Sequence, residues 1–172
     1  TEPVRKISIV ARGPAAGYTL QLPEKEKYLK RRAEFMDELA VLLGGWSAEK
    51  IVFHDITTGA ANDLEKASEL VRKLVKVYGM SERLGPVVFG EREELVFLGK
   101  ELGEQRNYSE KTAVEIDREV FRLIKKAQQT ALKILKQNRK LLDKVAKELM
   151  KKETIEREEF EKLVGRHRKR KK

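Results

Sequence analysis

Apolar residues recur at intervals of three and four along most of this chain, and this spacing predicts a mainly helical protein. The clearest pattern follows Ser109, where a long amphipathic helix is predicted with the apolar positions Ile116, Val120, Leu123, Ile124, Ala127, Ala131, Ile134 and Leu135. Further helices are predicted over residues 28–43, 47–53 and 62–78, then around Leu141 to Leu149 and around Phe160 to Leu163. Helices therefore account for most of the predicted structure.

Two short segments near the amino end alternate between apolar and polar residues, as strands do. Lys6 to Ala11 places Ile7 and Ile9 on one face, and Tyr18 to Leu22 alternates until Pro23. The stretch between them contains Gly and Pro and is typical of a turn. We therefore predict a mainly α fold with a small N-terminal β-hairpin or strand pair. The first strand presents either an ordinary exposed edge or an edge to which an extended peptide adds.

Glycine and serine mark where the predicted helices end and begin. Gly44-Gly45 predicts the end of the helix over residues 28–43, since glycine accepts the left-handed conformation that follows a helix. Gly79 predicts the end of the helix over residues 62–78 for the same reason. Ser109 is predicted to cap the long helix, with Glu110 in the first turn, where the helix dipole favours an acid.

The composition narrows the possible chemistry. The 172 residues are enough for one core or for two small subdomains, and there is no cysteine, which excludes disulfides, thiolate metal sites and cysteine nucleophiles. No apolar run approaches the ~20 residues that cross a bilayer. The net charge is +10, and six of the positive charges lie in residues 166–172. Such a terminal run predicts a solvated, disordered tail, and the alternative is a contact with RNA, DNA or anionic lipid.

The candidate chemistry lies in the stretch 57–63, Thr-Thr-Gly-Ala-Ala-Asn-Asp, at the entrance to a predicted helix. A carboxylate there is either an ordinary first-turn acid, favoured by the helix dipole, or a metal ligand. Zinc accepts a carboxylate oxygen beside imidazoles, so Asp63 is the candidate ligand. Asn62 is a candidate for orienting a ligand. Glu49, on the preceding helix, is either an acceptor for a ligand imidazole or a solvated helix acid.

Several catalytic motifs do not occur in the sequence. There is no HExxH, so two imidazoles and a general base cannot come from that motif. There is also no GxxxxGK(S/T) phosphate loop and no Gly-x-Ser-x-Gly elbow. His54 has no second histidine four residues away, and we interpret it as a loop residue.

Ordered motifs run through nearly the whole chain. They occupy residues Lys6–Gly13, Gly17–Pro23, Leu42–Gly45 with Ala48-Glu49, Thr57–Asp63, Tyr78–Pro86, Phe97–Lys100 and Asn107–Ser109. Together they resemble the peptidase domain of the FtsH family, the membrane-anchored ATP-dependent zinc proteases. The resemblance extends from about Val4 to Gly165. It implies a peptidase domain over residues 1–165, followed by a basic disordered tail over residues 166–172.

The resemblance implies a metal site and partners. The family holds zinc with two histidines of a HEAGH helix and with the aspartate that matches Asp63, and the HEAGH glutamate is the general base. The strand implied to pair with polypeptide substrates matches Ile7, Ser8, Ile9, Val10 and Ala11. The family forms a hexamer whose ATPase module uses ATP and Mg. The implied location is the cell inner membrane or an organelle equivalent, through a membrane anchor, with the peptidase domain in the cytoplasm.

This sequence holds one of the three expected zinc ligands. In the family the HEAGH motif lies just upstream of the first strand, and we expect this sequence to start after it. We therefore predict a fragment that is soluble, and inactive by itself because two ligands and the base are missing. Two other functions stay open, a helical module that assembles rings without chemistry and a basic helical nucleic-acid binder. The concentration of charge in residues 166–172 argues against nucleic acid as a partner.

Overall fold

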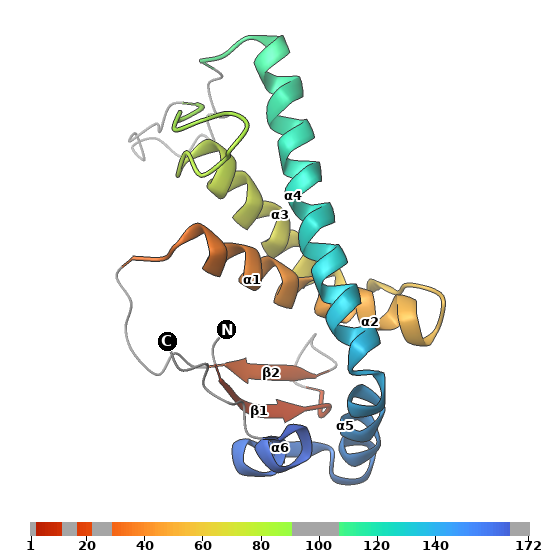
Figure 1. Cartoon of the computed structure of the whole chain (residues 1–172). Helices are drawn as coiled ribbons and strands as arrows, with labels where there is room; N and C mark the ends of the chain where they lie inside the picture. The colour runs from red at the N-terminus through yellow and green to blue at the C-terminus, as the bar shows by residue number, and fades with distance from the viewer. Residues whose placement is uncertain (1–2, 12–16, 22–28, 91–106, 166–172) are drawn as a thin grey trace, which may run out of the picture. The chain divides into compact units, whose positions relative to one another are not determined.

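The computed structural model describes residues 3–11, 17–21, 29–90 and 107–165, and helices predominate in them (Figure 1). The predicted mainly α fold with a small sheet is confirmed. The chain divides into two compact units, one of residues 30–131 and one that joins residues 1–29 to 132–172. The described helices are α1 Arg32–Leu42, α2 Gly44–Val52, α3 Ala61–Lys76, α4 Glu110–Gln137, α5 Arg139–Lys152 and α6 Arg157–Val164, with a short 3₁₀ helix, η1, at Thr58–Ala60.

The core of the unit over residues 30–131 is built by the apolar faces of α1, α3 and α4. Leu39, Leu74 and Leu123, one from each helix, are fully buried in a single cluster of apolar side chains. The helical period of the sequence explains this packing, because residues three and four apart share one face. Burying each leucine is worth roughly 1.5–3 kcal/mol. The apolar faces predicted from the sequence are therefore the ones that hold this unit together.

Two of the predicted helix boundaries are confirmed and one is wrong. Gly79 has a φ of +58°, shortly after α3 ends, and the Ser109 hydroxyl accepts a hydrogen bond from the Thr112 amide at 3.3 Å in the first turn of α4. Gly44-Gly45 does not form a stop, because Gly44 is the first residue of α2. The chain changes direction at Leu43 instead, a buried residue with φ −81° and ψ 1°. The boundary between α1 and α2 is therefore at the buried residue Leu43 and not at the glycine pair.

The small sheet contains one strand more than the sequence predicted. Its order is β2-β1-β3, with β1 at Val4–Ser8, β2 at Tyr18–Gln21 and β3 at Thr154–Glu156. Both neighbours run antiparallel to β1. β3 lies between α5 and α6, and both helices contact the sheet. The predicted hairpin is thus completed by a strand from far along the chain, which makes β1 the central strand.

Close contacts fix the end of β1. The Ser8 side chain is buried, and its hydroxyl lies 3.0 Å from the Thr154 hydroxyl. A Cβ atom at Gly17 would lie 2.6 Å from the Ser8 carbonyl oxygen, so only glycine fits there. The Ile9 amide donates to the Glu153 carbonyl at 2.9 Å, and β1 ends at Ser8, three residues before the predicted boundary at Ala11. Throughout the described ranges, every helix is too short or too polar to span a lipid bilayer.

Candidate functional site

Asp63 lies in the first turn of α3, where the sequence predicted a carboxylate. The short helix η1 runs into α3 without a break, because Ala61 follows Ala60 directly in helical conformation. Asp63 is partly exposed, and no described residue forms a hydrogen bond or ion pair with its carboxylate. A helix N-terminus favours a negative charge at this position. The carboxylate oxygens of Asp63 therefore remain available to a ligand.

Glu49 holds the loop that leads to Asp63. One carboxylate oxygen accepts a hydrogen bond from the Thr57 amide at 2.7 Å, and the other accepts from the Thr57 hydroxyl at 3.0 Å. The Thr57 hydroxyl oxygen in turn accepts from the Gly59 amide at 3.1 Å. We call this set, Glu49 with Thr57 and Gly59, the Thr57 clamp. Glu49 is therefore not simply a solvated acid, and its predicted bond to a ligand imidazole stays a prediction.

The other polar residues of the segment make fewer contacts. Asn62 is exposed, and within the described ranges its side chain makes no hydrogen bond, so its predicted role in orienting a ligand stays a prediction. His54 is also exposed, in a left-handed conformation with φ 57°, as suits a loop residue. Neither side chain is held against Asp63 by a contact that the described structure contains.

The described residues do not form a complete zinc site. Among them, no three His, Cys, Asp or Glu side chains lie close enough together to hold a metal ion. Asp63 suits one coordination position, because its carboxylate has no competing partner in the described part of the chain. The donor set is thus one carboxylate, and no catalytic step can be assigned to this chain's residues alone.

The strand predicted to pair with substrate is not an edge strand over its paired length. Ile7 lies opposite Thr19 of β2 on one side and opposite Ile155 of β3 on the other, and Ser8 is paired on both sides as well. The prediction of an open edge at these two residues is therefore wrong, because the distant strand β3 occupies it. Beyond β1, the side chains of Ile9, Val10 and Ala11 are exposed.

A buried carboxylate that the sequence analysis missed lies in α4. Glu119 is 1% exposed, and it accepts hydrogen bonds from Arg122 Nε at 2.6 Å, Arg122 Nη2 at 2.8 Å and the Ser81 hydroxyl at 2.9 Å. The Ser81 oxygen also accepts from the amides of Arg83 and Leu84. Glu119 thereby ties the turn after α3 to α4.

The charge state of Glu119 follows from these contacts. Burial raises the pKa of Glu119, but the hydrogen bonds from Arg122 and Ser81, together with the positive charges of Arg122 and Arg83, outweigh burial and hold that pKa below its ordinary value. The sequence did carry a signal, since Glu119 stands three residues after Ile116 and four before Leu123, both buried. A charge at a core position, with an arginine three residues later, is the pattern of a buried ion pair.

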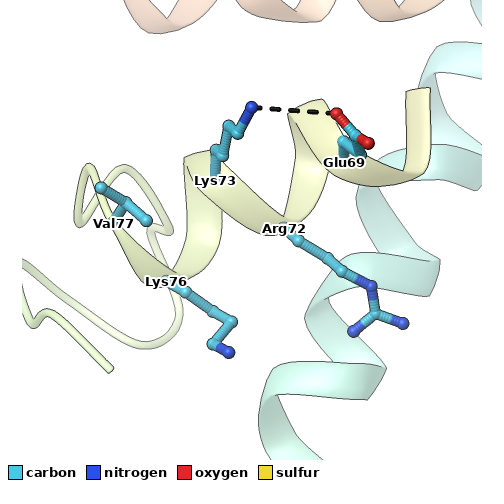
Figure 2. Close-up of a pocket in the computed structure, with 5 residues that line it drawn as sticks. All are labelled: Glu69, Arg72, Lys73, Lys76 and Val77. Carbon is cyan, nitrogen blue, oxygen red and sulfur yellow. Dashed lines mark ion pairs between the residues drawn. The ribbon is translucent and has the colours of Figure 1, made fainter. Parts of the chain in front are cut away.

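A surface hollow of about 460 Å³ lies along the second half of α3 (Figure 2). It is lined by Glu69, Arg72, Lys73, Lys76 and Val77. Lys73 pairs with Glu69 at 3.8 Å, and Arg72 pairs with Asp117 of α4 at 3.7 Å. Figure 2 shows Lys73 and Glu69 on one side of the helix and Arg72 and Lys76 on the other. We interpret the hollow as a solvated charged surface, separate from Asp63 at the opposite end of α3.

Comparison with known proteins supplies the wider context for Asp63. The model of peptidase family M41 matches residues 1–163. ATP-dependent zinc metalloprotease FtsH 1 of Thermoanaerobacter sp. (strain X514) is 53% identical over 165 residues, which are 96% of this chain and 27% of that protein. ATP-dependent zinc metalloprotease FtsH of Thermotoga maritima is 50% identical over 165 residues, 95% of this chain and 27% of that protein. The chain spans about a quarter of the length of these curated relatives.

Proposed function

The chain belongs to peptidase family M41, and from this premise we propose that Asp63 is the carboxylate ligand of a zinc endopeptidase site. The observation that carries the proposal is the placement of Asp63. Its carboxylate lies in the first turn of α3, shortly after the Thr57 clamp in the sequence, and no residue of the described ranges forms a hydrogen bond or ion pair with it. The relatives that match are named zinc metalloproteases, and zinc takes carboxylate oxygen together with imidazole nitrogen.

The chemistry divides between this chain and residues that its sequence does not contain. Zinc bound in such a site lowers the pKa of a coordinated water and polarises the scissile carbonyl. In this proposal Asp63 would hold one coordination position, and Asn62, the residue before it in the sequence, would orient a neighbouring ligand. The sequence has no HExxH motif to supply two imidazoles and a general base. We therefore propose that the 172-residue chain by itself binds zinc weakly and does not cleave peptides.

In the whole protein we propose an ATP-driven, membrane-anchored protease that degrades unfolded or membrane proteins. The relatives carry the words ATP-dependent in their names and are about three and a half times as long as this chain, which leaves room for an ATPase module with ATP and Mg. Residues 1–165 form the peptidase domain in this proposal, and the tail at 166–172 lies outside the described residues. The proposed location is the inner membrane or its organelle equivalent, with the peptidase domain in the cytoplasm.

Polypeptide substrates need an open strand edge if they bind by strand addition. Since β1 is paired on both sides, we propose that the substrate adds to the outer edge of β2 at Thr19 and Leu20, in the middle of the strand Tyr18–Gln21. Within the described ranges, no strand pairs with that edge. β3 has an outer edge as well, but it is three residues long and lies directly between two helices.

We propose a homo-oligomer, a hexamer in the whole protein, with α4 at a contact between copies. Phe121 is 73% exposed and Val114 is 48% exposed. The two residues are seven apart and share one face of α4. Exposed apolar side chains on one face, with the charged residues Asp117 and Arg118 between them, are typical of a protein–protein contact.

Zinc titration tests the proposed role of Asp63. The 172-residue chain should show no tight site, whereas a longer chain that carries a HEAGH helix ahead of it should bind one zinc ion. In the longer chain, Asp63→Asn should weaken zinc binding by more than about 100-fold, because one of three protein ligands is lost. The matched control is Glu65→Gln, an exposed acid on the same helix. Unchanged zinc affinity in Asp63→Asn would contradict the assignment.

A further inference from the structure

We infer that Glu49 positions Asp63 by fixing the start of its helix through the Thr57 clamp. The inference rests on the proposed function of Asp63 and adds a second residue to it. The role differs from the predicted bond between Glu49 and a ligand imidazole, since here Glu49 acts on the protein backbone. A carboxylate has about four acceptor positions, so both roles fit the same side chain.

Glu49 binds the loop before α3 through both of its carboxylate oxygens. Its two oxygens take the amide and the hydroxyl of one residue, Thr57, at 2.7 and 3.0 Å. Hydrogen bonds to an ionised carboxylate are about twice as strong as those between neutral groups. Two such bonds to a single residue fix both its position and its rotation. Glu49 therefore holds Thr57 more firmly than a single hydrogen bond would.

Thr57 is connected to Asp63 through η1 and the first turn of α3. Thr57 is the N-cap of η1, and its hydroxyl accepts from the Gly59 amide at 3.1 Å. The Ala61 amide bonds back to the Thr58 carbonyl, and α3 continues from there to Asp63. Because η1 connects Thr57 directly to the first turn of α3, we expect a shift of Thr57 to move that turn.

The residues around the Thr57 clamp are closely packed. A Cβ atom at Gly59 would lie 3.2 Å from the Thr57 hydroxyl oxygen and 3.3 Å from the Glu49 carboxylate oxygen. Glycine at position 59 thus lets the backbone approach both groups closely. Next to it, Ala60 is buried at 4% exposure, which fixes the other side of the turn. The loop is held from both sides at the point where it becomes a helix.

The helix that carries Glu49, α2, is packed against the core of the unit over residues 30–131. Ser47, two residues earlier on α2, is fully buried, and Leu43 just before that helix is 3% exposed and belongs to the core of the unit. α2 contacts both α1 and η1. Glu49 is therefore carried by a helix whose other side is packed against the core. A carboxylate on a well-packed helix can hold a loop in place, as do the residues that hydrogen-bond to metal ligands and fix their orientation.

The first measurement uses the 172-residue chain without metal. Amide hydrogen exchange by NMR should be about tenfold faster at Thr57 and Gly59 in Glu49→Gln than in the wild type, since the charge-assisted bonds are lost. Exchange at Leu74, in the core of α3, should not change. Thr57→Val should speed amide exchange at positions 57 and 59 as Glu49→Gln does. Thr57→Ser keeps the hydroxyl and should keep exchange slow, and Glu65→Gln should exchange as the wild type does.

The second measurement uses the longer chain with the HEAGH helix, and zinc chloride as the probe. Glu49→Gln and Thr57→Val should weaken zinc binding by about 10- to 100-fold, and Thr57→Ser by much less. A wild type that binds no zinc overturns the proposed function itself. A wild type that binds zinc, beside a Glu49→Gln variant with equal affinity or with unchanged exchange at Thr57 and Gly59, overturns only the positioning role.

Discussion

Glu119 is a charged residue on the buried face of α4, where the helical period predicts an apolar side chain. Its carboxylate is almost completely buried and is held by Arg122 and Ser81. Removing one partner of a buried pair costs more than the pair contributes, because the remaining charge loses its compensation. The Arg122 side chain is 35% exposed, so water can solvate it in part if Glu119 is changed. The expected cost is therefore moderate.

Glu119→Gln should lower the free energy of unfolding at pH 7 by about 2 kcal/mol. The effect depends on pH, because the folded pKa of Glu119 lies below its ordinary value of 4.5. A lowered pKa contributes stability above the unfolded pKa, and that stability is lost as the pH falls through the folded value. The difference between wild type and variant should hence shrink below about pH 4.5.

Urea unfolding at pH 7 and at pH 3 measures this difference, with Glu65→Gln as the control for an exposed acid. Glu65→Gln should change stability by less than about 0.5 kcal/mol at both pH values. A Glu119→Gln variant that loses the same stability at pH 3 as at pH 7 would show that the charge of Glu119 does not contribute.

Sequence reasoning found the carboxylate at Asp63 but not the residue that holds its loop. The position of Asp63 follows from local rules, since an acid after small residues at a helix entrance is a local pattern. The bonds from Glu49 to Thr57 join residues eight apart across a turn, and no periodicity of the sequence encodes such a contact. Local patterns place a residue on an element, whereas partners across a loop depend on the folded path.

At the scale of the element, the two faces of α4 differ sharply. Leu123 is fully buried between helices, and Phe121, two residues earlier, is 73% exposed. Leu123→Ala should lower the free energy of unfolding of the 172-residue chain by about 2–5 kcal/mol, because it leaves a cavity in the core. Phe121→Ala should change it by less than about 1 kcal/mol. Urea unfolding gives both values, and equal losses would contradict the assigned faces.

The long helices were predictable and the small sheet only in part. α3 and α4 follow from an apolar period that repeats over several turns, so one residue that departs from the period does not change the prediction. β3 has three residues, and its pairing with β1 joins positions almost 150 residues apart. Neither its length nor its alternation identifies it. The prediction of an open edge on β1 was wrong for this reason alone.

The revised edge makes a prediction about substrate. A photo-crosslinking residue at Thr19, exposed on β2, should capture an unfolded polypeptide such as casein several-fold better than one at Glu156, exposed on β3. The physical reason is that, among the described strands, β3 is short and directly flanked by α5 and α6, whereas no described strand pairs with the outer edge of β2. The measurement uses the longer protein with its general base replaced, so that bound polypeptide is not cleaved. Equal capture at both positions would remove β2 as the site of addition.

At the scale of the whole molecule, more than half of the net charge of +10 comes from residues 166–172. Six of the positive charges lie in residues 166–172, and the helices carry acids and bases that pair across their surfaces. The rest of the sequence carries a net charge of only 10 − 6 = +4, and the exposed apolar residues of the described ranges are the more specific surface. A contact between copies would bury these residues in the way that an interface buries its centre.

Assembly through α4 follows from Phe121 and Val114, which share one exposed face. An aspartate at position 121 would bring a charge into that contact without a partner, and a buried unpaired charge is strongly unfavourable. Phe121→Asp should hence shift the mass of the full-length protein toward the monomer in light scattering. Met150→Asp, at a residue 79% exposed on α5, is the matched control and should leave the mass unchanged. If Phe121→Asp keeps the mass of the wild type, this face of α4 does not join the copies.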